Sequence, residues 1–335
     1  MKVPPGLSYS SDSDPGLTRK GAGRGFAFYY PDGTLLQDAR EKDRLKALAV
    51  PPAYRDVWYC LKPEGHLQAT GRDDRGRKQY RYHPEWTAWR DEQKFSNLID
   101  FGEALPKLRS QLKTRLSRDG LHKERVVAAV VKLLDETAAR IGNEAYLKEN
   151  GTRGLTTLKE SDVSVKGGQL LLSYRAKGGE RREFDIDDPT LLKIVQHLED
   201  LPGQRLFNYE SDGEIHSVTS SDVNEWLREH ADAEITAKDF RTWRASQLTL
   251  STLCKMPKVD TKKELLAQET EALKQTSKAL GHRPPVCRKH YVHPQILEDH
   301  QAGMLAKWSQ HQVSGRGGLR KNELVFIDFL KERCA

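Results

Sequence analysis

The first third of the chain alternates short apolar stretches with turn residues, a pattern typical of antiparallel strands. The strand-like segments are residues 25–30, 34–36, 57–61, 66–70 and 78–83. The preceding residues 1–24 are rich in Ser, Asp, Gly and Pro, and carry too little apolar surface to fold alone. We therefore expect a flexible leader over residues 1–24 and a small β-rich domain over residues 25–95.

Beyond residue 84 the apolar positions recur at helical spacing, as they do between Val127 and Ile141. Helices are predicted over residues 86–98, 105–116, 189–198, 223–230, 244–253 and 262–280. A β-hairpin over residues 169–186 interrupts them, and its tip carries Lys177 and two glycines. The predicted fold class is α+β: a small antiparallel β-rich N-terminal domain, then a larger, mainly α-helical domain over residues 96–335 with an embedded β-hairpin.

Composition excludes several classes of protein. The 335 residues suffice for about two domains. The aliphatic run at residues 126–131 is far shorter than the roughly twenty residues of a membrane span. The N-terminus has no apolar segment of a secretory signal. The four cysteines form no CxxC pair, which favours free thiols in the cytoplasm over disulfides. We expect no membrane association and no export.

The charge balance favours a polyanionic partner. Fifty-five Lys and Arg exceed forty-eight Asp and Glu, for a net charge of +7. Basic and aromatic residues alternate within one predicted strand and the turn before it, at Arg72, Lys78, Tyr80, Arg81 and Tyr82. Such a run suits contact with a DNA backbone, although charged residues also protect the edge of a sheet.

Four later segments carry reactive or cationic side chains: Arg140 in the first, Lys177 in the second, Arg241 in the third, and both His282 and Tyr291 in the fourth. In this order they resemble the type IB DNA topoisomerases of the small poxvirus and bacterial kind, which are related to the catalytic domain of tyrosine recombinases. The family blocks R-x-G-[NK], K-x-x-R-T and G-H-x-P are matched at residues 140–143, 238–242 and 281–284. Where the family has a Lys three residues before the Tyr, this chain has Arg288. The similarity covers about residues 20–330.

The resemblance implies that residues 96–335 are a catalytic domain, in which Tyr291 cleaves one DNA strand and forms a 3′-phosphotyrosyl link. Arg140 and Arg241 would stabilise the developing charge, His282 would donate a further hydrogen bond, and Lys177 would protonate the leaving 5′-oxygen. Swivelling and religation would then relax positive and negative supercoils. We expect no metal and no cofactor, and a monomer that clamps duplex DNA of the bacterial nucleoid without an obligate protein partner.

In the poxvirus members, the third, fifth and sixth positions after the first catalytic Arg read bases in the major groove. Here these positions hold Asn143, Ala145 and Tyr146. Because two lysine-type contacts are absent, we expect weak sequence preference that rests mainly on phosphate contacts. Asn143 and Tyr146 remain candidates for DNA contact.

Other interpretations stay open. A tyrosine site-specific recombinase shares the catalytic set, but generally has His-x-x-Arg where this chain has Lys238-x-x-Arg241. A non-catalytic basic DNA-binding protein would bind DNA without any need for Tyr291. Cys287, His290 and His293, each three residues apart, suit zinc by spacing but lack a nearby fourth ligand.

Overall fold

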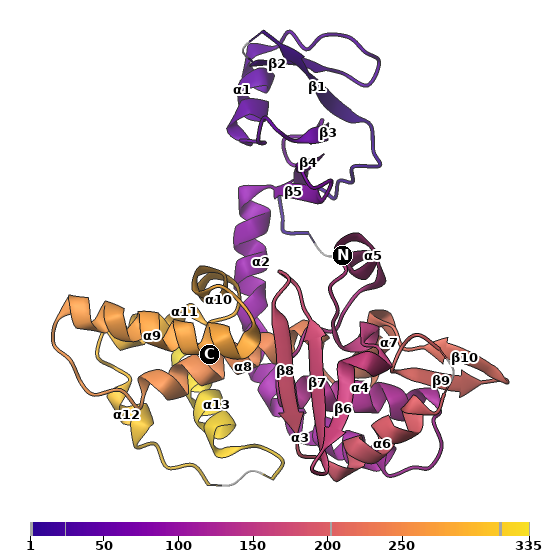
Figure 1. Ribbon diagram of the computed structural model, residues 1–335. Coiled ribbons are helices and arrows are strands. Elements are labelled where there is room, and N and C mark those ends of the chain that lie inside the picture. Colours follow the sequence, from indigo (N-terminus) through magenta and orange to yellow (C-terminus); the bar gives the residue numbers. More distant parts are fainter. Residues whose placement is uncertain (1–2, 24, 202, 315–316, 335) are drawn as a thin grey trace. The chain divides into compact units, whose positions relative to one another are not determined.

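The computed structural model describes residues 3–23, 25–201, 203–314 and 317–334 (Figure 1). The chain divides after Lys94 into two compact units, residues 1–94 and 95–335. The helix α2 (Pro84–Ser96) spans this boundary. Each unit has a separate hydrophobic core, which makes each a candidate for independent folding.

The first unit is built on an antiparallel five-stranded sheet, in the order β2-β1-β3-β4-β5. Its elements are β1 (Gly16–Ala22), β2 (Gly25–Tyr29), α1 (Ala39–Ala47), β3 (Arg55–Cys60), β4 (Leu67–Arg72) and β5 (Lys78–Tyr82). Leu17, Phe28, Leu45 and Tyr59 form the centre of its core. The β-rich N-terminal domain predicted from the sequence is therefore confirmed.

The strand β1 lies within the segment expected to be a flexible leader, so that expectation is wrong for residues 16–22. This strand pairs with β2 on one side and β3 on the other, and Leu17 is fully buried. Hydrogen bonds to two neighbouring strands supply the stability that the polar composition of the segment lacks. Along its length β2 pairs with β1, and the turn that follows brings Leu35 back to Tyr29 as an isolated antiparallel bridge.

The second unit is mainly helical, as predicted. Its helices are α3 (Leu98–Leu116), α4 (Lys123–Thr137), α5 (Glu144–Asn150), α6 (Pro189–Glu199), α7 (Ser220–Ala231), α8 (Ala237–Leu253), α9 (Lys262–Leu280), α10 (Pro284–His290), α11 (Pro294–Gln301), α12 (Ala306–Ser309) and α13 (Lys321–Cys334). The helix α4 is central, since residues 126–131 are all buried and α3, α6, α7 and α8 pack around it. Within the described ranges, none of the helices has the length and apolarity of a membrane span.

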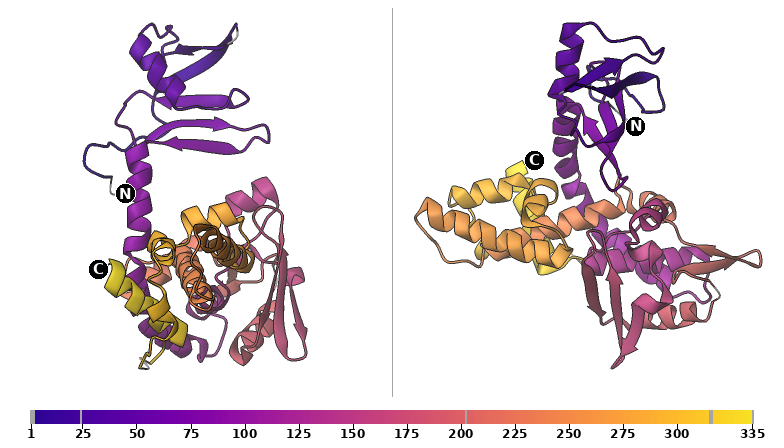
Figure 2. Two further views of the ribbon diagram at one scale, coloured as in Figure 1. Left: turned by 90° about the vertical axis from the view of Figure 1, so that its left-hand side faces the viewer. Right: turned by 45° about the horizontal axis from the view of Figure 1, so that its top comes forward.

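Two small sheets complete this unit. The predicted hairpin is present as β7 (Gln169–Arg175) and β8 (Arg181–Ile186), and β6 (Val163–Lys166) extends it to three antiparallel strands (Figures 1 and 2). A second hairpin, β9 (Asn208–Ser211) with β10 (Glu214–Ser217), is not predicted from the sequence. Its strands are short and almost wholly polar, so they lack the apolar alternation on which the prediction depends.

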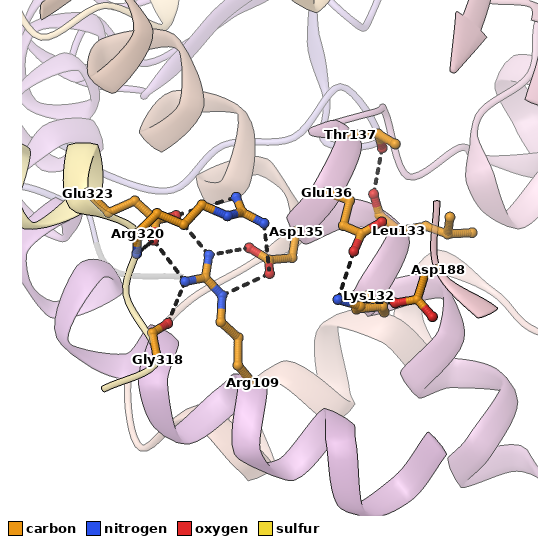
Figure 3. A network of polar contacts seen from close by, with 10 residues as sticks. All are labelled: Arg109, Lys132, Leu133, Asp135, Glu136, Thr137, Asp188, Gly318, Arg320 and Glu323. Atoms are coloured by element: carbon orange, nitrogen blue, oxygen red, sulfur yellow. Dashed lines mark hydrogen bonds and ion pairs between the residues drawn. The ribbon is translucent and has the colours of Figure 1, made fainter. Parts of the chain in front are cut away.

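A buried ionic network attaches the last helix to the core (Figure 3). Arg109 of α3 donates to both oxygens of Asp135 of α4, at 2.8 and 2.9 Å, and to both oxygens of Glu323 of α13, at 2.7 and 2.8 Å. Phe326 of α13 packs on Trp243 of α8, with ring centroids 4.8 Å apart. The helix α13 therefore supports α8, which carries Arg241.

Candidate active site

Four of the five predicted catalytic residues line one pocket of about 260 Å³ in the second unit: Arg140, Lys177, Arg241 and Tyr291. The fifth, His282, adjoins it, because its ring stacks on the Tyr291 ring with centroids 4.3 Å apart. The fold therefore brings together side chains from four separate segments of the sequence. That convergence is what the ordered motifs predict.

Arg140 is placed by a sharp turn at the end of α4, where Ala138 adopts a left-handed conformation with φ of 48°. The backbone oxygen of Arg140 accepts from the amide of Leu155 at 2.9 Å. Gly154 permits this approach, because a Cβ there would lie 2.4 Å from the nitrogen of Gly142. Glycine is thus required where the two backbone segments cross.

Arg241 is buried on α8 and is held by main-chain oxygens. It donates to the carbonyl oxygens of Ala138 and Leu280, the latter at 2.8 Å. Burial, together with the nearby charge of Arg140, lowers the pKa of Arg241 to about 10, which leaves it a cation at neutral pH. Among the residues that the structure describes, neither Arg140 nor Arg241 forms an ion pair with a carboxylate. The site therefore retains an uncompensated positive charge, which favours an anionic ligand.

The imidazole of His282 lies between the two guanidiniums. Nη2 of Arg140 is 3.0 Å from Nδ1 of His282, and Nη2 of Arg241 is 2.7 Å from Nε2. In a neutral imidazole, one nitrogen can accept a hydrogen bond and the other carries a hydrogen. One of the two contacts therefore places an arginine N–H against the imidazole N–H. Burial and the charges of Arg241 and Arg140 lower the pKa of His282 to about 3, so the ring is neutral at pH 7. A phosphate oxygen among these groups would accept from all of them.

Tyr291 is half-buried at the end of α10, where its amide donates to the oxygen of Cys287 at 3.0 Å. Three signals in the sequence shape this segment. Gly281 ends α9 with φ of +67°, and Pro284 and Pro294 occupy the first turns of α10 and α11. The centroid of the phenol ring lies 5.6 Å from Cζ of Arg241. The phenol is therefore beside the cations.

Lys177 is exposed at the β7–β8 tip, with its Nζ 4.5 Å from the centroid of the Tyr146 ring. Tyr146 lies on α5, also exposed and also lining the pocket. Asn143 caps the start of α5, because its Oδ1 accepts from the amides of Ala145 and Tyr146 at 2.9 and 3.3 Å. The DNA contact predicted for Asn143 would thus have to share its side chain with this structural role.

In the first unit, the basic and aromatic run does not form a single uninterrupted face. Tyr80 and Tyr82 stack on the edge strand β5, with centroids 6.1 Å apart, and both are almost half exposed. Lys78 pairs with Asp12, and Arg72 with Asp56 at 3.8 Å. Arg81, on the opposite face of the strand from Tyr80 and Tyr82, donates to the oxygen of Ala49 at 3.1 Å. Of this set, the two tyrosines present stacked, partly exposed rings, whereas Arg72, Lys78 and Arg81 each bond an oxygen of the protein.

Several residues near these surfaces are missed by the sequence-based prediction. Tyr9 is 61% exposed and stacks on His66, although it falls in the expected leader. Arg182 of β8 donates to the oxygens of Lys278 and Ala279 at the end of α9, at 2.8 and 2.5 Å. Nothing in the sequence distinguishes either residue from other surface tyrosines and arginines. Lys238 also lines the pocket, and the K-x-x-R block does indicate it.

The zinc alternative gains no support from the geometry. Cys287 is fully buried, and burial raises the pKa of its thiol to about 11. Nδ1 of His293 accepts from the amide of Gln295 at the start of α11. Over the described part of the chain, no three His, Cys, Asp or Glu side chains are placed to hold a metal ion.

Comparison with known proteins shows which proteins this chain is similar to. Residues 83–314 match the family model for the catalytic core of eukaryotic DNA topoisomerase I, and residues 25–73 match that for the N-terminal domain of bacterial DNA topoisomerase IB. DNA topoisomerase 1B of Acanthamoeba polyphaga mimivirus is 30% identical over 85% of this chain and 88% of its own length. The vaccinia virus (strain Copenhagen) DNA topoisomerase 1B is 22% identical over 81% of this chain and 89% of its own length.

A solved structure of the XerH site-specific recombinase bound to a palindromic difH substrate has a TM-score of 0.36 at 19% identity, covering 57% of this chain and 49% of that one. The sequence matches define an enzyme that changes DNA topology. More narrowly, the chain belongs to the type IB DNA topoisomerase family. This membership decides against the recombinase and the non-catalytic binding protein.

Proposed function

We propose that this topoisomerase relaxes positive and negative supercoils without ATP or metal, through a covalent intermediate on Tyr291. The observation that carries the proposal is the convergence of two guanidiniums on one neutral imidazole that stacks on the Tyr291 ring. A phosphodiester in the pocket would meet a nucleophile and fixed donors at once. Arg140 and Arg241 remain charged throughout, so they can take the place of a metal in stabilising the transition state.

The proposed reaction is a reversible transesterification. The Tyr291 oxygen bonds to phosphorus, its proton passes to solvent, and the bond from phosphorus to the 5′-oxygen breaks. Lys177 donates a proton to that oxygen and regains one from solvent. The phosphotyrosyl link conserves the bond energy, so after the strand swivels, the 5′-hydroxyl attacks phosphorus and releases Tyr291 without an energy source.

The identity of the general acid rests on the position of Lys177. The hairpin tip holds Lys177 at the pocket, and Gly178 and Gly179 both adopt positive φ, which suits a tight turn. Lys238 lines the same pocket and is the alternative acid. Replacing the leaving 5′-oxygen by sulfur would separate them, because a thiolate departs without protonation and rescues only loss of the true acid.

DNA binding in the proposal uses both units of a single chain, which would clamp the duplex as a monomer. Support in the first unit comes from the exposed pair Tyr80 and Tyr82, with Arg72, Lys78 and Arg81 nearby for phosphates. In the second unit, Asn143 and Tyr146 stand at the pocket wall. The match of residues 25–73 to a bacterial domain supports action on the nucleoid in the cytoplasm.

The decisive experiment is plasmid relaxation in EDTA without ATP, with wild type and Tyr291→Phe side by side. Wild type should relax both supercoil signs and leave a covalent protein–DNA adduct when quenched with detergent. The Phe variant should bind DNA with unchanged affinity and form no adduct. An adduct on the Phe variant would refute Tyr291 as nucleophile, and a requirement for magnesium would refute the proposed electrostatics.

A further inference from the structure

The backbone that follows Tyr291 is held by one buried hydroxyl group outside the pocket. Ser246 of α8 is completely buried. Its Oγ donates to the carbonyl oxygen of Tyr291 at 3.0 Å and accepts from the amide of His293 at 2.9 Å. Ser246 thus satisfies two main-chain groups of the turn that follows the nucleophile.

A buried carboxylate holds the same segment from another direction. Glu269 of α9 is only 1% exposed. It accepts from Nη1 of Arg288 at 2.9 Å and from Nε2 of Gln301 at 2.6 Å. Arg288 lies on α10, three residues before Tyr291, and Gln301 ends α11. Glu269 therefore ties together the two helices that flank the nucleophile.

We propose that Ser246 and Glu269 are positioning residues that fix the Tyr291 phenol against the phosphate-binding cations. The helix α10 has only seven residues, too few to be stable without tertiary anchors. The helix α8 carries both Ser246 and Arg241, so it sets the spacing between the nucleophile turn and the guanidinium. A misplacement of about 1 Å at a reacting atom can reduce a rate by about 100-fold.

This assignment also accounts for the basic residue before the nucleophile. One nitrogen of Arg288 is committed to a carboxylate that is almost inaccessible to water. Removing one partner of such a pair leaves an uncompensated buried charge. Arg288 therefore acts here mainly as an anchor of α10, through Glu269, rather than as a phosphate ligand.

The inference rests on the proposed role of Tyr291 and is tested on the full chain by single-turnover cleavage of a duplex at saturating enzyme. Ser246→Ala and Glu269→Gln should each slow adduct formation by about 10- to 100-fold. Their DNA affinities, measured in a Tyr291→Phe background, should stay within about twofold of the parent. The matched control is Thr249→Val, since Thr249 is a buried hydroxyl on the same helix that bonds Ala245 and Thr276 instead.

A 5′-bridging sulfur substrate distinguishes nucleophile placement from acid catalysis. The two positioning variants should remain slow on this substrate, whereas Lys177→Ala should recover. Melting temperatures and circular dichroism establish that each variant is folded at the assay temperature. Wild-type cleavage rates in both positioning variants would overturn the inference. It would also be overturned if Thr249→Val lost as much cleavage rate as the positioning variants while its melting temperature fell by the same amount as theirs. An adduct on Tyr291→Phe would instead refute the proposed function itself.

Discussion

The guanidinium of Arg241 is positioned by main-chain oxygens rather than by carboxylates. Its positive charge is therefore not neutralised within the protein and is available to a ligand. Its two terminal nitrogens bond the oxygens of Ala138 and Leu280, and one also contacts His282. An ammonium group cannot reproduce this planar fork. The charge at this site therefore depends on the arginine side chain itself.

We accordingly expect Arg241→Lys to lower the relaxation rate by about 100-fold or more, because the cation leaves its fixed position. Arg228→Lys on the exposed surface of α7 serves as the control and should match wild type. Timed relaxation assays at fixed enzyme measure both. Equal rates for Arg241→Lys and wild type would show that charge alone is sufficient.

His282 gives stability a defined pH dependence. Because its folded pKa of about 3 lies below its ordinary value of 6.5, the unfolded chain binds more protons between these values. The His282 contribution to folding stability is therefore complete above about pH 6.5 and is lost as the pH falls toward 3. Urea unfolding at pH 7 and pH 4.5 should show a larger loss in wild type than in His282→Gln. Equal losses would mean that His282 titrates normally.

At the level of elements, the crossing of two backbone segments at Gly154 decides where Arg140 points. Gly154→Ala should destabilise the protein by about 1–3 kcal/mol and reduce cleavage, since the new methyl group would overlap the nitrogen of Gly142. Gly21→Ala in β1 has nothing within 4 Å of the added carbon and should change stability by less than about 0.5 kcal/mol. Denaturant unfolding of both variants tests the difference.

The elements also show how far the sequence predicts this molecule. Long helices with an apolar stripe, such as α4 and α9, and the β7–β8 hairpin are recognised because their periodicity is strong. The strand β1 is missed because its stability comes from its neighbours rather than from its own composition. The candidate catalytic residues are predicted from motif order. Ser246 and Glu269 are not, since no local pattern shows which polar side chains become buried.

For the whole molecule, the two separate cores imply that catalysis can be separated from part of the DNA affinity. We expect the second unit alone to cleave DNA and the first unit to add to the affinity. Among the residues that the structure describes, the buried core of the second unit runs from Leu98 to Leu330 with Phe95 packed against it, and that of the first runs from Leu17 to Ala69. A chain of residues 84–335 should therefore fold and form the Tyr291 adduct. It should bind DNA more weakly, with a smaller slope of log affinity against log salt, because fewer phosphates are contacted. Failure of this piece to fold would show that the cores depend on each other.

The docking of α13 has a consequence for the cell during protein synthesis. Tyr291 leaves the ribosome before residues 321–334. Without Glu323, Arg109 keeps only one of its two carboxylate partners, and without Phe326 the Trp243 face of α8 is uncovered. An unfinished chain should therefore have the proposed nucleophile but lack a firmly supported Arg241. Under the proposed mechanism, the ability to cut DNA is thus expected to arise only after translation has passed α13, and abandoned nascent chains should leave no protein-linked breaks in DNA.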